Sequence, residues 1–155
     1  MQRHSIGFTL IEILVVLFIL GITISLAVLS FGDFGSEKRI LNAAEQFSSY
    51  VKLMQQEAII KNETLGMFID NKGYRAMHLI NQNWQKVSLS HLQFKTFPEQ
   101  TKITLIQDIY TESSEPQLKI NANGDFTPFQ IKFSSKKNPN IINVIGKNDG
   151  TIILQ

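Results

Sequence analysis

The apolar run from Ile13 to Gly32 constrains the fold of this chain more than any other feature. It holds 20 residues without a charged side chain. An α-helix of that length rises about 30 Å, which is the thickness of the hydrocarbon core of a bilayer. Arg3 and His4 precede the run. Because basic flanks stay on the cytoplasmic side, we expect a single-pass helix with the bulk of the chain outside the cytoplasm.

Glu12 stands directly before this run, at the end of the segment Gly7-Phe8-Thr9-Leu10-Ile11-Glu12. A carboxylate near the centre of a membrane helix costs about 2.5 to 3.5 kcal/mol. Such a group requires a compensating partner. A cut after Gly7 would create a new amine at Phe8, four residues from Glu12. An amine is therefore the partner that the sequence favours.

With the polar leader before it and the apolar run after it, this segment resembles the class III signal of type IV pilins and of type II secretion pseudopilins. The resemblance implies that a prepilin peptidase cleaves between Gly7 and Phe8 and that Phe8 is then N-methylated. It also implies that Glu12 guides assembly by meeting the new amine of a neighbouring subunit.

Two other interpretations of the amino-terminal segment are weaker. A plain membrane anchor needs the apolar run but has no use for Glu12. A secretory signal peptide needs a small-x-small cut site, which Ser25-Leu26-Ala27 resembles. Its apolar core would then have to contain Glu12, and apolar residues continue beyond Ala27.

A helical stripe follows the membrane run. Apolar residues recur at spacings of three and four, namely Ile40, Ala44, Phe47, Val51, Met54 and Ala58. This periodicity predicts an amphipathic helix with one buried face. A nearly continuous helix from Phe8 to Lys61 would be about 80 Å long. Gly32 and Gly35 predict a kink or brief unwinding, after which Ser36 would cap the second segment.

The remaining sequence predicts short antiparallel strands separated by turn residues. The expected strands span residues 65–69, 74–80, 84–89, 92–97, 103–109, 118–120, 129–133, 141–145 and 152–154. The last two should pair across the turn Asn148-Asp149-Gly150. Several short strands at this spacing indicate an antiparallel sheet or small sandwich.

Beyond the signal, the chain resembles the minor pseudopilin H family of type II secretion. The residues that carry this likeness are Gln55 to Lys61, Thr64 to Met67, Asn71 to Arg75, Ile120 to Phe129 and Gly146 to Gly150. The resemblance implies an α+β, pilin-like fold, with a long amino-terminal helix packed against the antiparallel head. It also implies a periplasmic fibre that exports folded proteins across the outer membrane, in which this subunit links a tip complex to the shaft.

These inferences divide the chain into four parts. Residues 1–7 form a leader that is removed, 8–32 a transmembrane and assembly helix, 33–62 an amphipathic periplasmic helix, and 63–155 a periplasmic β domain. The implied location is the bacterial inner membrane, with assembly into a periplasmic pseudopilus. The implied partners are other minor pseudopilins, the major pseudopilin, the prepilin peptidase and the inner-membrane secretion platform.

Composition argues against several other classes of function. The formal charge is +2, and it falls to +1 when Arg3 leaves with the leader, since 14 basic residues then face 13 acidic ones. This balance argues against a nucleic-acid partner. There are no cysteines, which excludes disulfides and thiolate sites. We expect no small-molecule substrate, no cofactor and no metal.

Residues able to support catalysis or cation binding are sparse. His78 lies in a strand pattern, and His91 follows Ser90 in a turn, so neither predicts a nucleophile and base that converge. Asp108, Glu112 and Glu115 match no known calcium loop, and solvated carboxylates are the simpler interpretation. The aromatic residues Trp84, Phe94 and Phe97 suit either a partner patch or the core, and the core is the commoner place. We therefore predict a protein that is not an enzyme.

Two alternatives to the secretion role remain open from the sequence. A minor type IV pilin that primes pilus growth or helps take up DNA would carry the same amino-terminal signal. A membrane-tethered binding module would carry an ordinary anchor and an unprocessed amino terminus.

Overall fold

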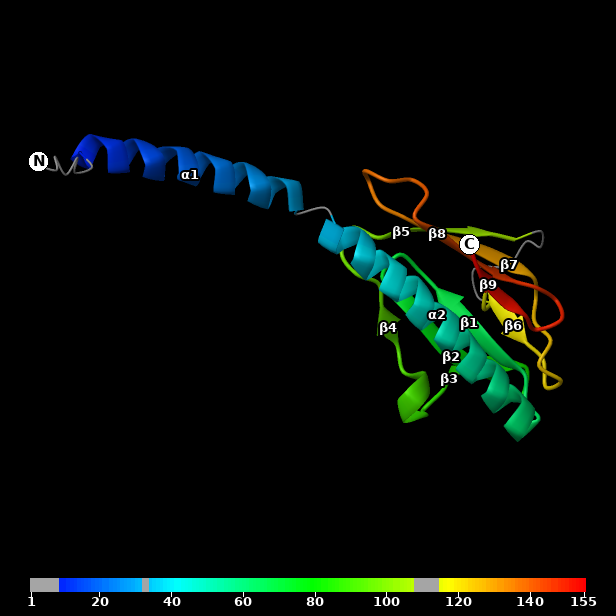
Figure 1. Ribbon diagram of the computed structural model, residues 1–155. Helices are drawn as coiled ribbons and strands as arrows, with labels where there is room; N and C mark the ends of the chain where they lie inside the picture. The colour runs from blue at the N-terminus through cyan, green and yellow to red at the C-terminus, as the bar shows by residue number, and fades with distance from the viewer. Residues whose placement is uncertain (1–8, 32–33, 108–114) are drawn as a thin grey trace, which may run out of the picture. The chain divides into compact units, whose positions relative to one another are not determined.

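The computed structural model describes residues 9–31, 34–107 and 115–155. The chain divides into two compact units, Met1–Ser36 and Glu37–Gln155. The first unit contains helix α1 (Leu10–Phe31), and the second contains nearly all of helix α2 (Phe34–Lys61) together with two antiparallel sheets (Figure 1). Helix α1, helix α2 and the sheets follow one another along the chain in the order expected for an α+β, pilin-like protein.

Helix α1 is apolar around its whole circumference. The described side chains from Leu10 to Val28 are all exposed, and none of this stretch is buried by the rest of the chain. By length and composition it is long and apolar enough to cross a membrane. No described residue of its own unit covers these side chains, so its stability as a helix must come from backbone hydrogen bonds and from its surroundings.

Helix α2 confirms the predicted stripe. Ile40, Ala44, Phe47, Val51, Met54 and Ala58 are each at most 1% exposed. The helix ends at Lys61, as expected, but it begins at Phe34. Ser36 therefore lies inside the helix, and the prediction that it caps α2 was wrong. Gly35 is also helical, so the prediction of an interruption at that residue was wrong, and Gly32 lies outside the described residues.

The first sheet contains β1 (Leu65–Ile69), β2 (Gly73–Ile80), β3 (Asn83–Lys86), β4 (Lys95–Thr96) and β6 (Leu118–Ile120). Its order is β3-β2-β1-β6, and β4 also pairs with β2. All of its pairings are antiparallel. The hairpin of β1 and β2 confirms the predicted first hairpin of the head.

The second sheet contains β5 (Lys102–Ile106), β7 (Phe129–Ser134), β8 (Ile142–Gly146) and β9 (Ile152–Leu154), in the order β5-β7-β8-β9. Strand β8 pairs with β9 across the turn that the sequence predicted. Gly150 in that turn has a φ of 81°, a conformation that glycine adopts without steric strain.

The prediction of strands at residues 84–89 and 92–97 was wrong in extent. Strand β3 ends at Lys86, and β4 contains only Lys95 and Thr96. Between them a 3₁₀ turn, η1 (Ser90–Leu92), places Leu92 in the core at 1% exposure. Strands β3 and β4 share one edge of β2, so neither can pair along the full length of that edge.

Phe47 lies where α2 meets both sheets. Its ring centroid is 5.0 Å from that of Tyr74 in β2, and 6.2 and 6.0 Å from those of Phe129 and Phe133 in β7. All four side chains belong to one core cluster that also includes residues of β1, β6 and β8. The buried stripe of α2 therefore joins the two sheets through a single core.

Candidate functional site

The amino-terminal end of α1 is organised around Thr9 and Glu12. The Glu12 backbone N–H donates to the Thr9 hydroxyl at 3.4 Å and to the Thr9 carbonyl at 3.1 Å. Thr9 therefore caps the helix, and the spacing Thr-x-x-Glu is that of a capping box. Gly7 and Phe8, the predicted cleavage and methylation positions, lie outside the described residues.

The other described polar side chains of α1 are satisfied by their own helix. The Thr23 hydroxyl donates to the Leu20 carbonyl at 2.9 Å, and the Ser25 hydroxyl donates to the Gly21 carbonyl at 2.8 Å. Such bonds make hydroxyl groups tolerable in an apolar environment. The Glu12 side chain is exposed, and no hydrogen bond or ion pair joins its carboxylate to the described part of the chain. Among the described polar side chains of α1, the Glu12 carboxylate is therefore the group without a hydrogen-bond partner in its own helix.

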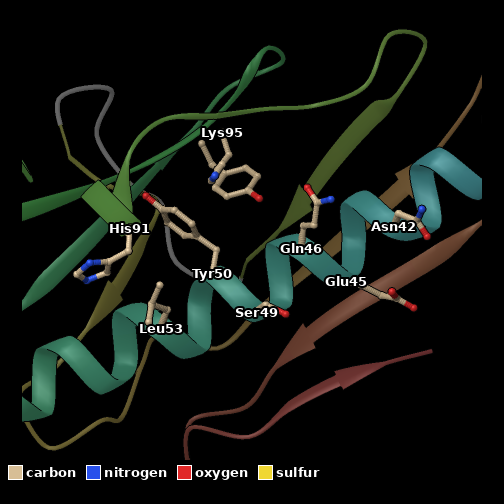
Figure 2. A pocket seen from close by; sticks show the side chains of 9 residues that line it. Asn42, Glu45, Gln46, Ser49, Tyr50, Leu53, His91 and Lys95 are labelled. Atoms are coloured by element: carbon tan, nitrogen blue, oxygen red, sulfur yellow. The ribbon is translucent and has the colours of Figure 1, made fainter. Parts of the chain in front are cut away.

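The head carries a groove along the exposed side of α2 (Figure 2). Its volume is about 480 Å³. One wall of the groove is formed by side chains of α2, namely Asn42, Glu45, Gln46, Ser49, Tyr50 and Leu53. The rest of the lining comes from Tyr74, His91 and Lys95. Its polar, mixed-charge lining suits a surface that contacts protein or solvent more than one that encloses a small apolar ligand.

Tyr50 links α2 to η1 and β2 through hydrogen bonds. Its hydroxyl donates to the Leu92 carbonyl at 2.7 Å and accepts from the Ala76 backbone N–H at 3.0 Å. Burial raises the pKa of Tyr50 to about 12, so the phenol is neutral at ordinary pH. The hydroxyl therefore holds η1 against α2 and is not available as a base.

Gln55 joins α2 to one turn beside each sheet. Its Nε2 donates to the Gly124 carbonyl at 2.8 Å and to the Gly150 carbonyl at 3.3 Å. Gly124 lies in the turn after β6, and Gly150 lies in the turn between β8 and β9. Neither Tyr50 nor Gln55 was singled out as a tethering residue from the sequence.

The groups considered for catalysis do not form a reaction centre among the described residues. His78 lies in β2 and His91 in η1, as expected. His91 Nε2 is 3.5 Å from Glu57, which also binds Lys61 at 2.8 Å. The Lys61 hydrogen bond lowers the pKa of Glu57 and keeps it ionised. This arrangement is a surface charge cluster, with no nucleophile in it.

The carboxylates considered for calcium are only partly described. Asp108 and Glu112 lie outside the described residues, whereas Glu115 pairs with Lys119 at 2.6 Å. No group of three or more potential metal ligands occurs in the described ranges.

The three aromatic residues considered as a patch are in different environments. Phe97 packs in the core between Tyr74 and Phe133. Phe94 is 46% exposed, with the Arg75 guanidinium 5.6 Å from its ring centroid. Trp84 is half-buried on β3, above Gly66. They therefore do not form one continuous patch.

Comparison with known proteins identifies the family of this chain. The sequence model of the family described as type II transport protein GspH matches residues 43–150. The chain belongs to the GspH family. A second model, the prokaryotic N-terminal methylation motif, matches residues 2–28 of this GspH-family chain. The match to the GspH model favours type II secretion over a minor type IV pilin.

Individual GspH relatives match over most of their length. Type II secretion system protein H of Pseudomonas aeruginosa is 26% identical over 148 residues, which cover 87% of this chain and 86% of that protein. Type II secretion system protein H of Aeromonas hydrophila is 23% identical over 155 residues, covering 88% and 85%. Membership in the GspH family makes the protein a component of type II secretion.

Solved structures confirm the fold. The minor pseudopilin EpsH of Vibrio cholerae superposes with a TM-score of 0.65 at 22% identity, over 76% of this chain and 96% of that one. The solution structure of GspH from E. coli superposes with a TM-score of 0.65 at 16% identity, over 77% and 89%. The predicted pilin-like arrangement of a helix and an antiparallel head is thereby confirmed.

Proposed function

We propose that the protein is a minor pseudopilin that links a tip complex to the major-pseudopilin shaft of a periplasmic fibre, and so supports export of folded proteins across the outer membrane. In this role α1 is held in the bacterial inner membrane until assembly, and the head lies in the periplasm. The role is structural and uses no cofactor.

The observation that carries the proposal is the exposure of α1. Leu10 is 84% exposed, Leu17 63% and Phe18 67%. An exposed apolar surface of this extent must be covered by lipid or by other apolar helices. Within the head, the buried stripe of α2 is covered by the two sheets. The apolar side chains of α1 would be covered by lipid before assembly and by the apolar helices of neighbouring subunits in the fibre.

The amino terminus is proposed to be processed before assembly. Cleavage between Gly7 and Phe8 by the prepilin peptidase, followed by N-methylation of Phe8, would leave an amine two residues before the start of α1. The leader residues 1–7 are then absent from the mature chain. The match to the N-terminal methylation motif supports this step.

Glu12 is proposed to select the neighbouring subunit. Its carboxylate has no partner in the described part of its own helix, and a methylated amine is positively charged at ordinary pH. An ion pair between Glu12 and the amine of the next subunit would neutralise both groups in an apolar medium, where an unpaired charge is expensive.

Mass spectrometry of the membrane-extracted protein tests the processing step. We expect a mature chain that begins at Phe8 and carries one added methyl group. A chain that retains Met1 to Gly7 would contradict the proposal and support the membrane-tethered binding module. Gly7→Ala should block leader removal, so the uncut product of that variant serves as the reference mass.

Crosslinking in cells tests the role of Glu12. Glu12→Ala should still insert, since the apolar run becomes longer, but it should not join the fibre. Glu12→Gln is the matched variant, because it keeps the size and hydrogen-bonding capacity and removes only the charge. Normal crosslinks of both variants to neighbouring subunits would show that Glu12 does not select them. Loss of exoprotein secretion in the same cells, with pilus functions retained, would separate this role from that of a minor type IV pilin.

A further inference from the structure

The end of the head at which α2 begins carries a group of exposed basic side chains. Its members come from three elements, namely Lys38 and Arg39 in α2, Lys102 at the start of β5, and Lys136 in the connection between β7 and β8; we call this group the basic end. All four side chains are exposed, and no ion pair joins them to any residue that the structure describes.

Hydrogen bonds hold these elements together. Asn138 Nδ2 donates to Glu37 Oε1 at 3.2 Å, which places the β7–β8 connection against the first turns of α2. The Ser135 N–H donates to the Asn138 carbonyl at 2.8 Å, so the turn that contains Lys136 is closed. The connection, drawn in orange, reaches the end of the head where α2 starts (Figure 1).

Lys102 is placed at the same end by sheet register. It is paired with Ser134, the last residue of β7, and the Ser134 hydroxyl donates to the Lys102 carbonyl at 3.2 Å. Two acidic residues lie close to the basic end, Glu37 through its contact with Asn138 and Glu99 through its position in the sequence. Glu37 is half-buried and accepts the Asn138 hydrogen bond, and Glu99 is exposed three residues before Lys102. The four basic side chains therefore outnumber the exposed described acid at this end.

Covalent geometry ties the basic end to the apolar helix. Only residues 32 and 33 separate the last residue of α1 from the first residue of α2. Three peptide steps span at most about 11 Å, so the start of α2 stays within that reach of the end of α1 in any orientation of the head. Lys38 and Arg39 follow Phe34 by about 6 and 7.5 Å of helical rise, so they lie at most about 17 to 19 Å from Phe31, which is the last residue of α1. The Debye length in physiological salt is about 8 Å, so these side chains interact with the headgroups when this end of the head lies against the bilayer.

We propose that the basic end is a docking surface for anionic phospholipid headgroups, which holds the head against the bilayer before the subunit enters the fibre. The inference rests on the proposed insertion of α1. Lysine suits this partner because its ammonium is a flexible point charge that binds phosphate without a fixed geometry. An acidic neighbouring subunit is the less favoured partner, because the covalent tether brings lipid to this surface in every unassembled copy.

The full mature chain, reconstituted in vesicles, provides the test. Because the chain has no cysteine, Asn140→Cys in the β7–β8 connection supplies a unique site for a fluorescent label. Quenching of the label by headgroup-labelled lipid reports the distance of the basic end from the membrane. We compare vesicles of phosphatidylcholine with vesicles that also contain phosphatidylglycerol.

Quenching should be strong only in the vesicles with phosphatidylglycerol. It should disappear in about 1 M salt, where the Debye length falls to about 3 Å. Each basic residue near an anionic surface should change the docking equilibrium about fivefold, so the variant K38Q/R39Q/K102Q/K136Q should abolish the lipid dependence. The control K86Q/K147Q removes two exposed lysines from other parts of the head and should behave like the parent.

Three results would overturn the proposal. The first is equal quenching in both kinds of vesicle. The second is an unchanged lipid dependence in the fourfold variant, which circular dichroism must show to be folded. The third is a lipid dependence of the parent chain that persists in about 1 M salt. Lost crosslinking of the fourfold variant to a neighbouring subunit in cells, found together with the second result, would assign the basic end to a contact between subunits. Carbonate extraction is read separately, since release of the parent chain from vesicles would contradict insertion of α1 and hence the proposed function itself.

Discussion

Helices α1 and α2 have the same backbone conformation but depend on different partners. In α1 the described side chains are exposed on every face, whereas in α2 one stripe is fully buried and the opposite face is polar. The difference lies in the spacing of apolar residues, which is continuous in α1 and three or four in α2. It shows that α2 is stabilised by its own chain, whereas the described side chains of α1 are not covered by that chain.

The largest expected effect comes from removing the residue that joins α2 to both sheets. Phe47→Ala should lower the free energy of unfolding of the head by about 3 to 5 kcal/mol, because it leaves a cavity at the meeting point of three elements. Denaturant unfolding of the full chain in detergent, followed by fluorescence of the single tryptophan, measures this loss.

Phe18→Ala is the matched change in α1, where the side chain is 67% exposed. It should leave the unfolding of the head unchanged. A loss of head stability similar to that of Phe47→Ala would break the distinction between the two helices.

A smaller effect is expected at Tyr50. Tyr50→Phe removes a hydroxyl that satisfies the Ala76 N–H and the Leu92 carbonyl, so it should cost about 1 to 3 kcal/mol. The same unfolding assay measures it. Tyr74→Phe is the control, because no hydrogen bond joins the Tyr74 hydroxyl to another described residue. Equal losses in the two variants would contradict a tethering role for Tyr50.

The stability of the head should also decline in alkaline solution. Burial raises the pKa of Tyr50 to about 12 and raises the pKa of Tyr74 as well, from about 10 in the unfolded chain. The folded state therefore holds these protons more tightly. Its stability is complete below about pH 10 and falls as the pH rises toward 12. Unfolding measured across this range should show a weaker decline in Tyr50→Phe, and an identical decline would rule Tyr50 out as a cause.

The smallest expected effect is at Gln55. Gln55→Ala removes the hydrogen bonds to the Gly124 and Gly150 carbonyls and should cost about 1 kcal/mol. Hydrogen exchange of the amides in both turns should accelerate in this variant. Gln56→Ala, at an exposed neighbouring position, should change neither quantity. Acceleration in only one turn would mean that Gln55 does not couple the two sheets.

The sequence was most informative where the signal is local. The stripe of α2 was predicted residue by residue because helical periodicity depends only on near neighbours. Strand β1 and the hairpin of β8 and β9 were predicted for the same reason, since their turns carry glycine at a fixed place. Glu12 stood out because a lone carboxylate beside an apolar run is conspicuous without any knowledge of the fold.

Features that depend on distant residues were not predicted. Tyr50 meets Leu92, 42 positions away, and Gln55 meets Gly124 and Gly150, 69 and 95 positions away. Strands β3 and β4 were predicted to be longer than they are. Both pair with the same edge of β2, and this shared edge limits the length of each. The alternation of side chains along a strand does not indicate which strands share an edge.

The sharing of one core by α2 and both sheets has a mechanical consequence. Any pull or push transmitted from α1 reaches the head through the short link before Phe34 and then runs along α2. The buried stripe and the Gln55 amide connect α2 to both sheets and their turns, so the load is distributed over one core. In the proposed fibre, a load applied along α2 would therefore be shared by both sheets of the head.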